Sequence, residues 1–213
     1  MSEIFREIDE EMRQENLARL WKRFGPYVIG GAVAIIVITA AVTGWKSYTK
    51  SRQEALSVEF SEAMAMAEDQ AYESASVAYG QLAEKSGSGY ATLARFKEAA
   101  TLGQIGKTDE AVAIYEILSR DAFDSSLRDL ASLMGVYYQL DTAEPQVISA
   151  KLAPLTADDN PWRYSARELA GLLALREGDK AKTKELFEPL SKDSSAPEGV
   201  RVRAGEIMAI FGE

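Results

Sequence analysis

The sequence from Pro26 to Trp45 contains no charged residue and consists mainly of Val, Ile, Ala and Gly. As an α-helix, this stretch would extend about 30 Å, which matches the hydrocarbon thickness of a lipid bilayer. The alternative is a helix buried in a soluble core, but such a helix usually keeps a polar face, and none is visible here. We therefore predict a single membrane-spanning helix over residues 26–45.

The segment before this stretch, residues 1–25, mixes acidic and basic residues, and its apolar residues recur with helical spacing. The apolar residues form two sets: Ile4, Phe5, Ile8 and Met12, then Leu17, Leu20, Trp21 and Phe24. This spacing predicts a short amphipathic helix leading into the membrane. This helix could either contact the lipid headgroups or be exposed to solvent, and the sequence leaves both interpretations open.

The apolar stretch is longer than the core of a secretory signal peptide, and six acidic residues precede it. We therefore expect an uncleaved signal anchor. Five Lys or Arg residues lie before the stretch, and three, Lys46, Lys50 and Arg52, follow it closely. Because positive residues favour the cytoplasmic side, we expect a cytoplasmic N-terminus. The C-terminal part would then be periplasmic, if the host is a Gram-negative bacterium, with the helix in its inner membrane.

Two pairs of small residues lie four positions apart within the apolar stretch, Gly30 with Ala34 and Ala40 with Gly44. Small residues at this spacing allow a second helix to approach closely in a membrane. These four residues are therefore candidates for lateral helix packing, and simple exposure to lipid is the alternative.

Residues 46–213 contain a pattern that repeats every 35–37 residues. Four short segments place apolar residues at positions i, i+3, i+4 and i+7, with Lys151 and Thr183 as departures. These segments are Ala75–Leu82, Ala111–Leu118, Ile148–Leu155 and Thr183–Leu190, and a second set of predicted helices lies between them, at 90–103, 126–140, 161–177 and 198–211. The spacing predicts helical hairpins.

The predicted turns carry typical helix-ending and helix-starting residues. Gly106 and Gly178 follow predicted helices, Asp109 and Asp179 are candidate N-caps, and Asn160 before Pro161 predicts a helix start. No stretch alternates with a period of two, so we expect an all-α protein. Residues 46–70 lack Gly and Pro and are expected to continue the membrane helix into the first hairpin, whereas the segment 198–213 would cap the array.

The composition excludes several kinds of chemistry. The chain has neither Cys nor His, so it cannot contain a thiol nucleophile, an imidazole base or a Cys/His zinc site. Residues 53–213 hold 16 of the 24 Lys and Arg residues and 27 of the 33 Asp and Glu residues, and this acidic character argues against nucleic acid as a ligand. We expect no enzyme activity, no cofactor, no metal and no small-molecule substrate.

Among the functions considered, protein recognition remains. Helical arrays bind their protein partners in grooves. Aromatic and Arg side chains dominate protein interfaces, so we select those on the helices predicted over 90–103, 126–140 and 161–177. The candidates are Tyr90, Arg95, Tyr137, Tyr138, Trp162, Tyr164 and Arg167. For each of them, packing within the array or solvation is the alternative.

Ala111 and Tyr115, with Gly106 in the turn before them, resemble the small, aromatic and turn positions of tetratricopeptide repeats. Together with the apolar stretch, this resemblance predicts a transmembrane helix followed by an α-solenoid of helix–turn–helix repeats, with boundaries at 1–25, 26–45 and 46–213. Three features together, the entry segment Glu15–Gly25, the anchor running to Tyr48 and the repeats ending near Ala204, resemble the ancillary-subunit family of the SecYEG translocon (YfgM type).

That resemblance implies a single-pass inner-membrane protein with a periplasmic repeat domain. Its implied partners are translocon subunits, a membrane-anchored periplasmic chaperone and translocating chains. Residues 1–14 have no counterpart in the resemblance. The alternative function is a scaffold for a cell-envelope assembly or cell-division complex.

Overall fold

The computed structural model describes the backbone of residues 2–211 and the side chains of residues 17–211 other than Ser88. Within the described residues there are nine α-helices, one short 3-10 helix and no strand, so the predicted all-α class is confirmed. The chain divides into two compact units, Met1–Ala55 and Leu56–Glu213, which are described separately below.

The first unit consists of the greater part of one long helix, α1 (Ser2–Glu68), which continues through Pro26. In the described part of the chain, α1 is the one helix long and apolar enough to cross a membrane. Its most apolar window has a mean hydropathy of 2.1, and none of that window is buried. Length and composition therefore make α1 compatible with a single-pass membrane anchor. The apolar set Ile4, Phe5, Ile8 and Met12 lies outside the residues whose side chains are described.

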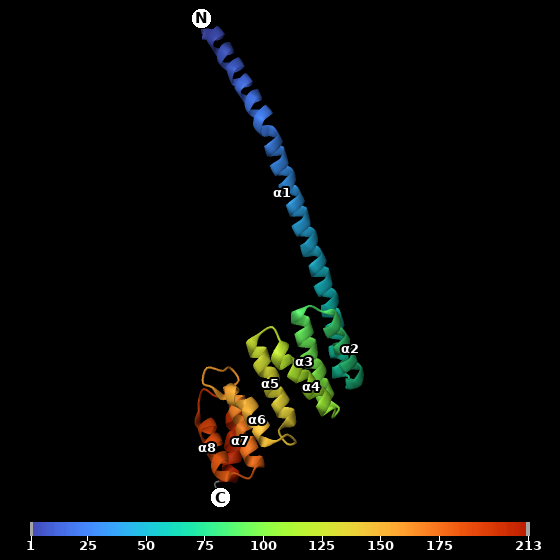
Figure 1. Cartoon of the computed structure of the whole chain (residues 1–213), viewed down its shortest axis with the longest axis vertical. Helices are drawn as coiled ribbons and strands as arrows, with labels where there is room; N and C mark the ends of the chain where they lie inside the picture. The colour runs from blue at the N-terminus through green and yellow to red at the C-terminus, as the bar shows by residue number, and fades with distance from the viewer. Residues whose placement is uncertain (1, 212–213) are drawn as a thin grey trace. The chain divides into compact units, whose positions relative to one another are not determined.

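The second unit is an array of helical hairpins, and Figure 1 shows its helices stacked in chain order. Residues 56–68 of α1 pair with α2 (Tyr72–Lys85), and α3 (Ser88–Gln104) pairs with α4 (Thr108–Asp121). The next hairpin joins α5 (Ser125–Gln139) to α6 (Pro145–Leu152) and its 3-10 extension η1 (Ala153–Thr156). The last joins α7 (Arg163–Arg176) to α8 (Lys180–Lys192), and α9 (Glu198–Ile210) packs on that hairpin.

The interior of the hairpins repeats with the period seen in the sequence. Phe60 lies 5.5 Å from Tyr79 between ring centroids, at an interplanar angle of 58°. One period later, Phe96 lies 6.0 Å from Tyr115 at 56°. Both tyrosines are buried, and burial of each such ring contributes on the order of 2 kcal/mol. The end of α1 therefore acts as the first helix of the first hairpin, as its lack of Gly and Pro predicted.

Successive hairpins are joined by bonds between residues one period apart. Lys151 Nζ lies 3.0 Å from Glu116 Oε1, a separation of 35 residues in sequence. Arg203 and Glu168, also 35 residues apart, form a bidentate ion pair. Contacts of this kind, between each repeat and the next, build the core of a helical solenoid.

Three turns of the array use the same left-handed backbone conformation. Gly106 has a φ of 76° and Gly178 a φ of 75°, as expected for glycines that end helices. In the first of these turns Lys107 N–H donates to Leu102 O at 3.0 Å, which satisfies a carbonyl at the end of α3. The equivalent position of the first hairpin is Gln70, with a φ of 62°, and a side chain there carries a conformational cost.

The helix starts agree with the sequence in part. Asp179 caps α8 through its side chain, as predicted. The N-cap of α4 is Lys107, whose side chain makes no capping hydrogen bond, so the prediction of Asp109 as a cap is wrong. Pro161 does not begin α7, because the Asn160 side chain accepts a backbone N–H two residues on and forms a turn, and the helix starts at Arg163.

Candidate protein-binding surfaces

Two cavities lie on opposite sides of α7. One side of the helix presents Ser165, Glu168, Leu169 and Leu172 to one cavity, and the other side presents Arg167, Ala170, Leu173, Ala174 and Glu177 to the second. At 3.6 residues per turn, the centres of the two sets are roughly 150° apart around the helix. A single helix therefore contributes to two separate surfaces.

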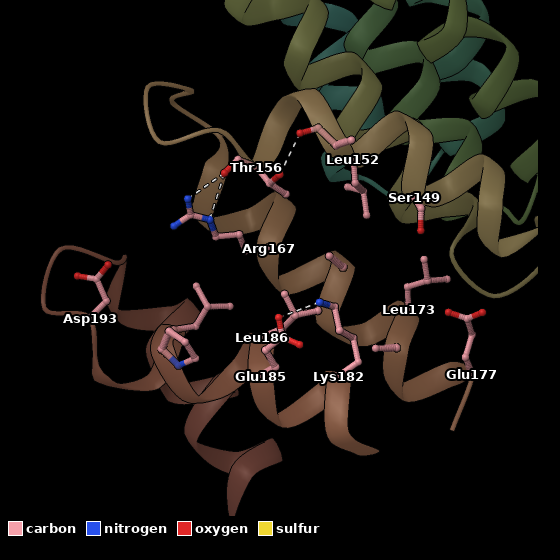
Figure 2. Close-up of a pocket in the computed structure, with 15 residues that line it drawn as sticks. Ser149, Leu152, Thr156, Arg167, Leu173, Glu177, Lys182, Glu185, Leu186 and Asp193 are labelled. Carbon is pink, nitrogen blue, oxygen red and sulfur yellow. Dashed lines mark hydrogen bonds and ion pairs between the residues drawn. The ribbon is translucent and has the colours of Figure 1, made fainter. Parts of the chain in front are cut away.

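The first cavity, which we call the α6–α8 cleft, has a volume of about 600 Å³ and lies between α6 with η1, α7 and α8. Figure 2 shows Leu152, Leu173 and Leu186 around it, with charged side chains at its margins. Arg167 donates from Nε and Nη2 to the backbone oxygen of Thr156, at 3.2 and 2.9 Å. These two bonds tie the end of η1 to α7 and hold that side of the cleft in place.

The second cavity, the α5–α9 pocket, has a volume of about 560 Å³. It is lined by Leu133, Met134 and Tyr137 from α5, Ser165, Glu168, Leu169 and Leu172 from α7, and Arg203 and Ile207 from α9. Its lining is mainly apolar, and its volume falls in the range typical of ligand pockets.

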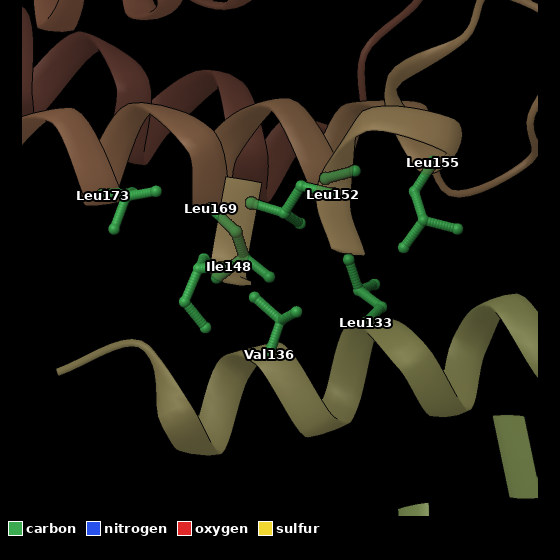
Figure 3. Packing of buried hydrophobic residues seen from close by; sticks show 8 residues of the cluster. Leu133, Val136, Ile148, Leu152, Leu155, Leu169 and Leu173 are labelled. Carbon is green, nitrogen blue, oxygen red and sulfur yellow. The ribbon is translucent and has the colours of Figure 1, made fainter. Parts of the chain in front are cut away.

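The floor of the α5–α9 pocket is part of the hydrophobic core. Figure 3 shows Leu133 and Leu169 packed with Ile148 and Leu152 of α6 in one cluster. Because the core holds these two leucines in place, the floor of the pocket is rigid. Tyr137, in contrast, is 60% exposed at its margin, where a partner can reach the ring.

An ion pair between a buried acid and an exposed base lines the same pocket. Arg203 donates from Nε and Nη2 to the two carboxylate oxygens of Glu168, at 2.5 and 2.8 Å. Glu168 is only 8% exposed, whereas the Arg203 side chain is 56% exposed. The hydrogen bonds that Arg203 donates to Glu168 raise the pKa of Arg203, so the guanidinium stays charged. The pair links α9 to α7 and leaves no isolated charge in the apolar pocket.

Two of the seven predicted groove residues line the two cavities described above. Tyr137 lines the α5–α9 pocket and Arg167 lines the α6–α8 cleft. Tyr138 is half-buried and stacks on Tyr115, with ring centroids 5.8 Å apart. Tyr90 is also half-buried and packs against the core of the first hairpin.

The other three predicted residues make contacts within the array. Trp162 Nε1 donates to the backbone oxygen of Ser126 at 2.9 Å, and buried Tyr164 donates its hydroxyl to Asp193. Arg95 lies 3.7 Å from Glu98, whose pKa is raised by burial. The seven residues therefore do not share one surface, and most of them support helix packing.

Glu168 and Arg203 were not among the residues predicted from the sequence. Their opposite charges, 35 residues apart on two helices separated by α8, were the available signal. Apolar lining residues such as Met134 and Leu172 carry no such signal, because their pattern is the same as that of core residues.

The four predicted packing residues of the first unit, Gly30, Ala34, Ala40 and Gly44, are all exposed on α1. A side chain added at Gly30 or Gly44 would meet no atom within 4 Å. Within the first unit, this face of the helix is open to another helix or to lipid.

The described residues contain no group of three or more His, Cys, Asp or Glu side chains that could hold a metal ion. The sequence contains neither His nor Cys, so the cavities have no imidazole or thiol group. The two cavities present apolar surface together with charged side chains, which are features that protein partners recognise.

The array, its turns and its cavities define an α-helical repeat protein of the interaction type. The chain belongs to the tetratricopeptide repeat-like domain family, whose profile matches residues 19–201. The match covers the apolar stretch as well as the repeats and begins after residues 1–14. Comparison with curated proteins and with solved structures gives no match.

Proposed function

We propose that this protein is a membrane-tethered adaptor that binds protein partners in the α5–α9 pocket. The observation that carries the proposal is an exposed aromatic ring, Tyr137, beside an apolar pocket with a rigid floor. Aromatic anchors next to well-packed apolar pockets are typical centres of protein interfaces. The family supports this proposal, because its repeats commonly act as interaction scaffolds.

We further propose that the partners are subunits of the Sec translocon and a membrane-anchored periplasmic chaperone, and that the adaptor helps to pass translocating chains between them. The support is the resemblance of the entry segment, anchor and repeats to the translocon's ancillary subunits. In this proposal α1 anchors the chain in the inner membrane with residues 1–25 in the cytoplasm. The small-residue pairs of α1, such as Gly30 with Ala34, contact a translocon helix.

Substitution of Tyr137 tests the pocket. Tyr137→Ala removes the exposed ring, and we expect partner capture in mild detergent to weaken at least tenfold, as for an interface anchor. Phe123→Ala is the matched control, because Phe123 is similarly exposed but lies in the turn before α5, outside the pocket. Equal capture by both variants would contradict a role for the pocket.

Photocrosslinking tests the identity of the partner. A photoreactive residue at position 30 or 34, in the native host, should form adducts with translocon subunits that mass spectrometry identifies. Adducts with division or envelope-assembly proteins instead, together with focal localisation at the septum, would favour the alternative scaffold function.

Protease accessibility tests the orientation. In intact spheroplasts, external protease should degrade the repeat unit and spare the N-terminal segment. Protection of the repeat unit would contradict the proposed periplasmic location and the role at the translocon.

A further inference from the structure

The α6–α8 cleft lies on the side of α7 opposite the α5–α9 pocket and shares no lining residue with it. Its apolar lining consists of Leu152, Ala153, Ala170, Leu173, Ala174, Leu186, Pro189 and Leu190. The proposed function does not use this surface. A volume of about 600 Å³ is enough for several side chains of a partner, and the cleft therefore needs its own explanation.

Carboxylates mark the two ends of the cleft. Asp193 accepts the hydroxyl of Tyr164, which places it beside the start of α7, whereas Glu177 directly follows the end of that helix. Figure 2 shows Asp193 and Glu177 on opposite sides of the apolar residues. From Tyr164 to Glu177, α7 rises by roughly 20 Å, and this length sets the scale of the separation between Asp193 and Glu177.

The cleft is lined by three acids, Glu177, Glu185 and Asp193, and by two cations, Lys182 and Arg167, which already have acidic partners; Arg163 also interacts with Asp193. Lys182 Nζ lies 2.9 Å from Glu185 Oε1, and Arg167 Nη2 lies 2.5 Å from Asp158 Oδ1. Hydrogen bonds from the backbone N–H of Ser195 and then from Tyr164 lower the pKa of Asp193, so this end stays ionised. The net charge of −9 on the whole chain adds a long-range attraction for cations.

We propose that the α6–α8 cleft binds an apolar segment of a partner protein that carries a basic residue at each end. The apolar side chains of the segment lie on the leucine-rich floor, and its two cations lie near Asp193 and Glu177. At about 3.3 Å per residue, an extended segment of about six residues spans the distance between the two acids. The adaptor then has two independent binding surfaces, one on each side of α7.

A pair of peptides tests the charge pattern. The full chain is placed in nanodiscs of phosphatidylcholine, a lipid without net charge, so that membrane adsorption of a basic peptide is weak. Fluorescence anisotropy then measures binding of labelled Lys-Leu-Ala-Leu-Leu-Lys and of its counterpart Glu-Leu-Ala-Leu-Leu-Glu. We expect saturable binding of the basic peptide and at least tenfold weaker binding of the acidic one. Equal binding of the two peptides, or no saturable binding of either, would overturn the proposal.

Three variants test the place of binding. Glu177→Lys reverses one end of the cleft and should weaken binding of the basic peptide about three- to tenfold. The exposed acid Glu62 lies on α1, away from the cleft, so Glu62→Lys makes the same charge change and should leave binding unchanged. Ala170→Trp fills the cleft and should abolish binding, while circular dichroism checks that the helices remain.

The α5–α9 pocket provides the remaining control. Tyr137→Ala should leave binding of the basic peptide unchanged, which separates this inference from the proposed function. Loss of peptide binding with Tyr137→Ala, or equal loss with Glu62→Lys and Glu177→Lys, would show that the cleft is not the site.

Discussion

A close contact between Gly171 and Phe187 leads to a sharp prediction about stability. Gly171 lies inside α7, where replacement by Ala would ordinarily stabilise the helix by about 1 kcal/mol. A Cβ at this position would, however, come within 2.6–3.0 Å of three ring atoms of Phe187. Phe187 is 0% exposed, so its ring cannot turn outward to make room.

The size of the destabilisation follows from comparison with a glycine that has open space around its Cα. Gly205 lies inside α9, and a Cβ there would meet no atom within 4 Å. Gly205→Ala should therefore gain the helix contribution of about 1 kcal/mol. Gly171→Ala gains the same contribution but adds an overpacking cost of about 1–3 kcal/mol. The difference between the two variants isolates that cost.

Thermal unfolding followed by circular dichroism measures the difference. For a unit of this size, we expect the Tm of Gly171→Ala to lie about 2–12 °C below that of Gly205→Ala. Urea unfolding of the same variants provides a second reading of the free energy. If Gly171→Ala were as stable as Gly205→Ala, the close packing of α7 against α8 at this point would be refuted.

Three further predictions concern the turns and the buried polar groups. Gln70→Gly should raise the free energy of unfolding by about 1 kcal/mol in urea titrations, since glycine relieves the left-handed conformation, and a decrease would contradict this. Burial raises the pKa of Tyr115 above its unfolded value of 10.0, so its stabilising contribution is complete below that pH and is lost progressively above it. Melting curves between pH 9 and pH 11 should show this loss, and Tyr115→Phe should reduce it. Arg203→Met should destabilise the unit by about 1–3 kcal/mol, because it leaves the Glu168 carboxylate without its ion-pair partner. Adding Glu168→Met should recover most of that loss. If it does not, the ion pair stabilises the unit by more than its desolvation costs.

Local patterns explain why the helices were predictable. The positions of Tyr79 and Tyr115 follow from a 3.6-residue period, and Gly106 and Gly178 end helices because glycine adopts positive φ at little cost. Such signals act within a few residues, so the sequence contains them in full. The third hairpin lacks the glycine turn and departs from the apolar pattern at Lys151, yet its helices α5 and α6 form.

The surfaces were less predictable, because their residues are brought together by the angle at which hairpins stack. Trp162 and Tyr164 have the chemistry of interface residues, but their hydrogen bonds join neighbouring helices of the array. Tyr137 has the same chemistry and remains exposed. Nothing local distinguishes these three side chains, since the distinction depends on which helix packs beside each one.

The sequence by itself determined an apolar helix long enough for a membrane, an acidic repeat array and the approximate positions of its helices. These properties depend on composition and on spacing within one or two turns. Only the tertiary structure decided that α7 faces two cavities, that Arg203 pairs with Glu168, and that acids lie at both ends of the α6–α8 cleft. The physical reason is that each of these features joins residues from two or more helices, and their meeting depends on how the hairpins stack.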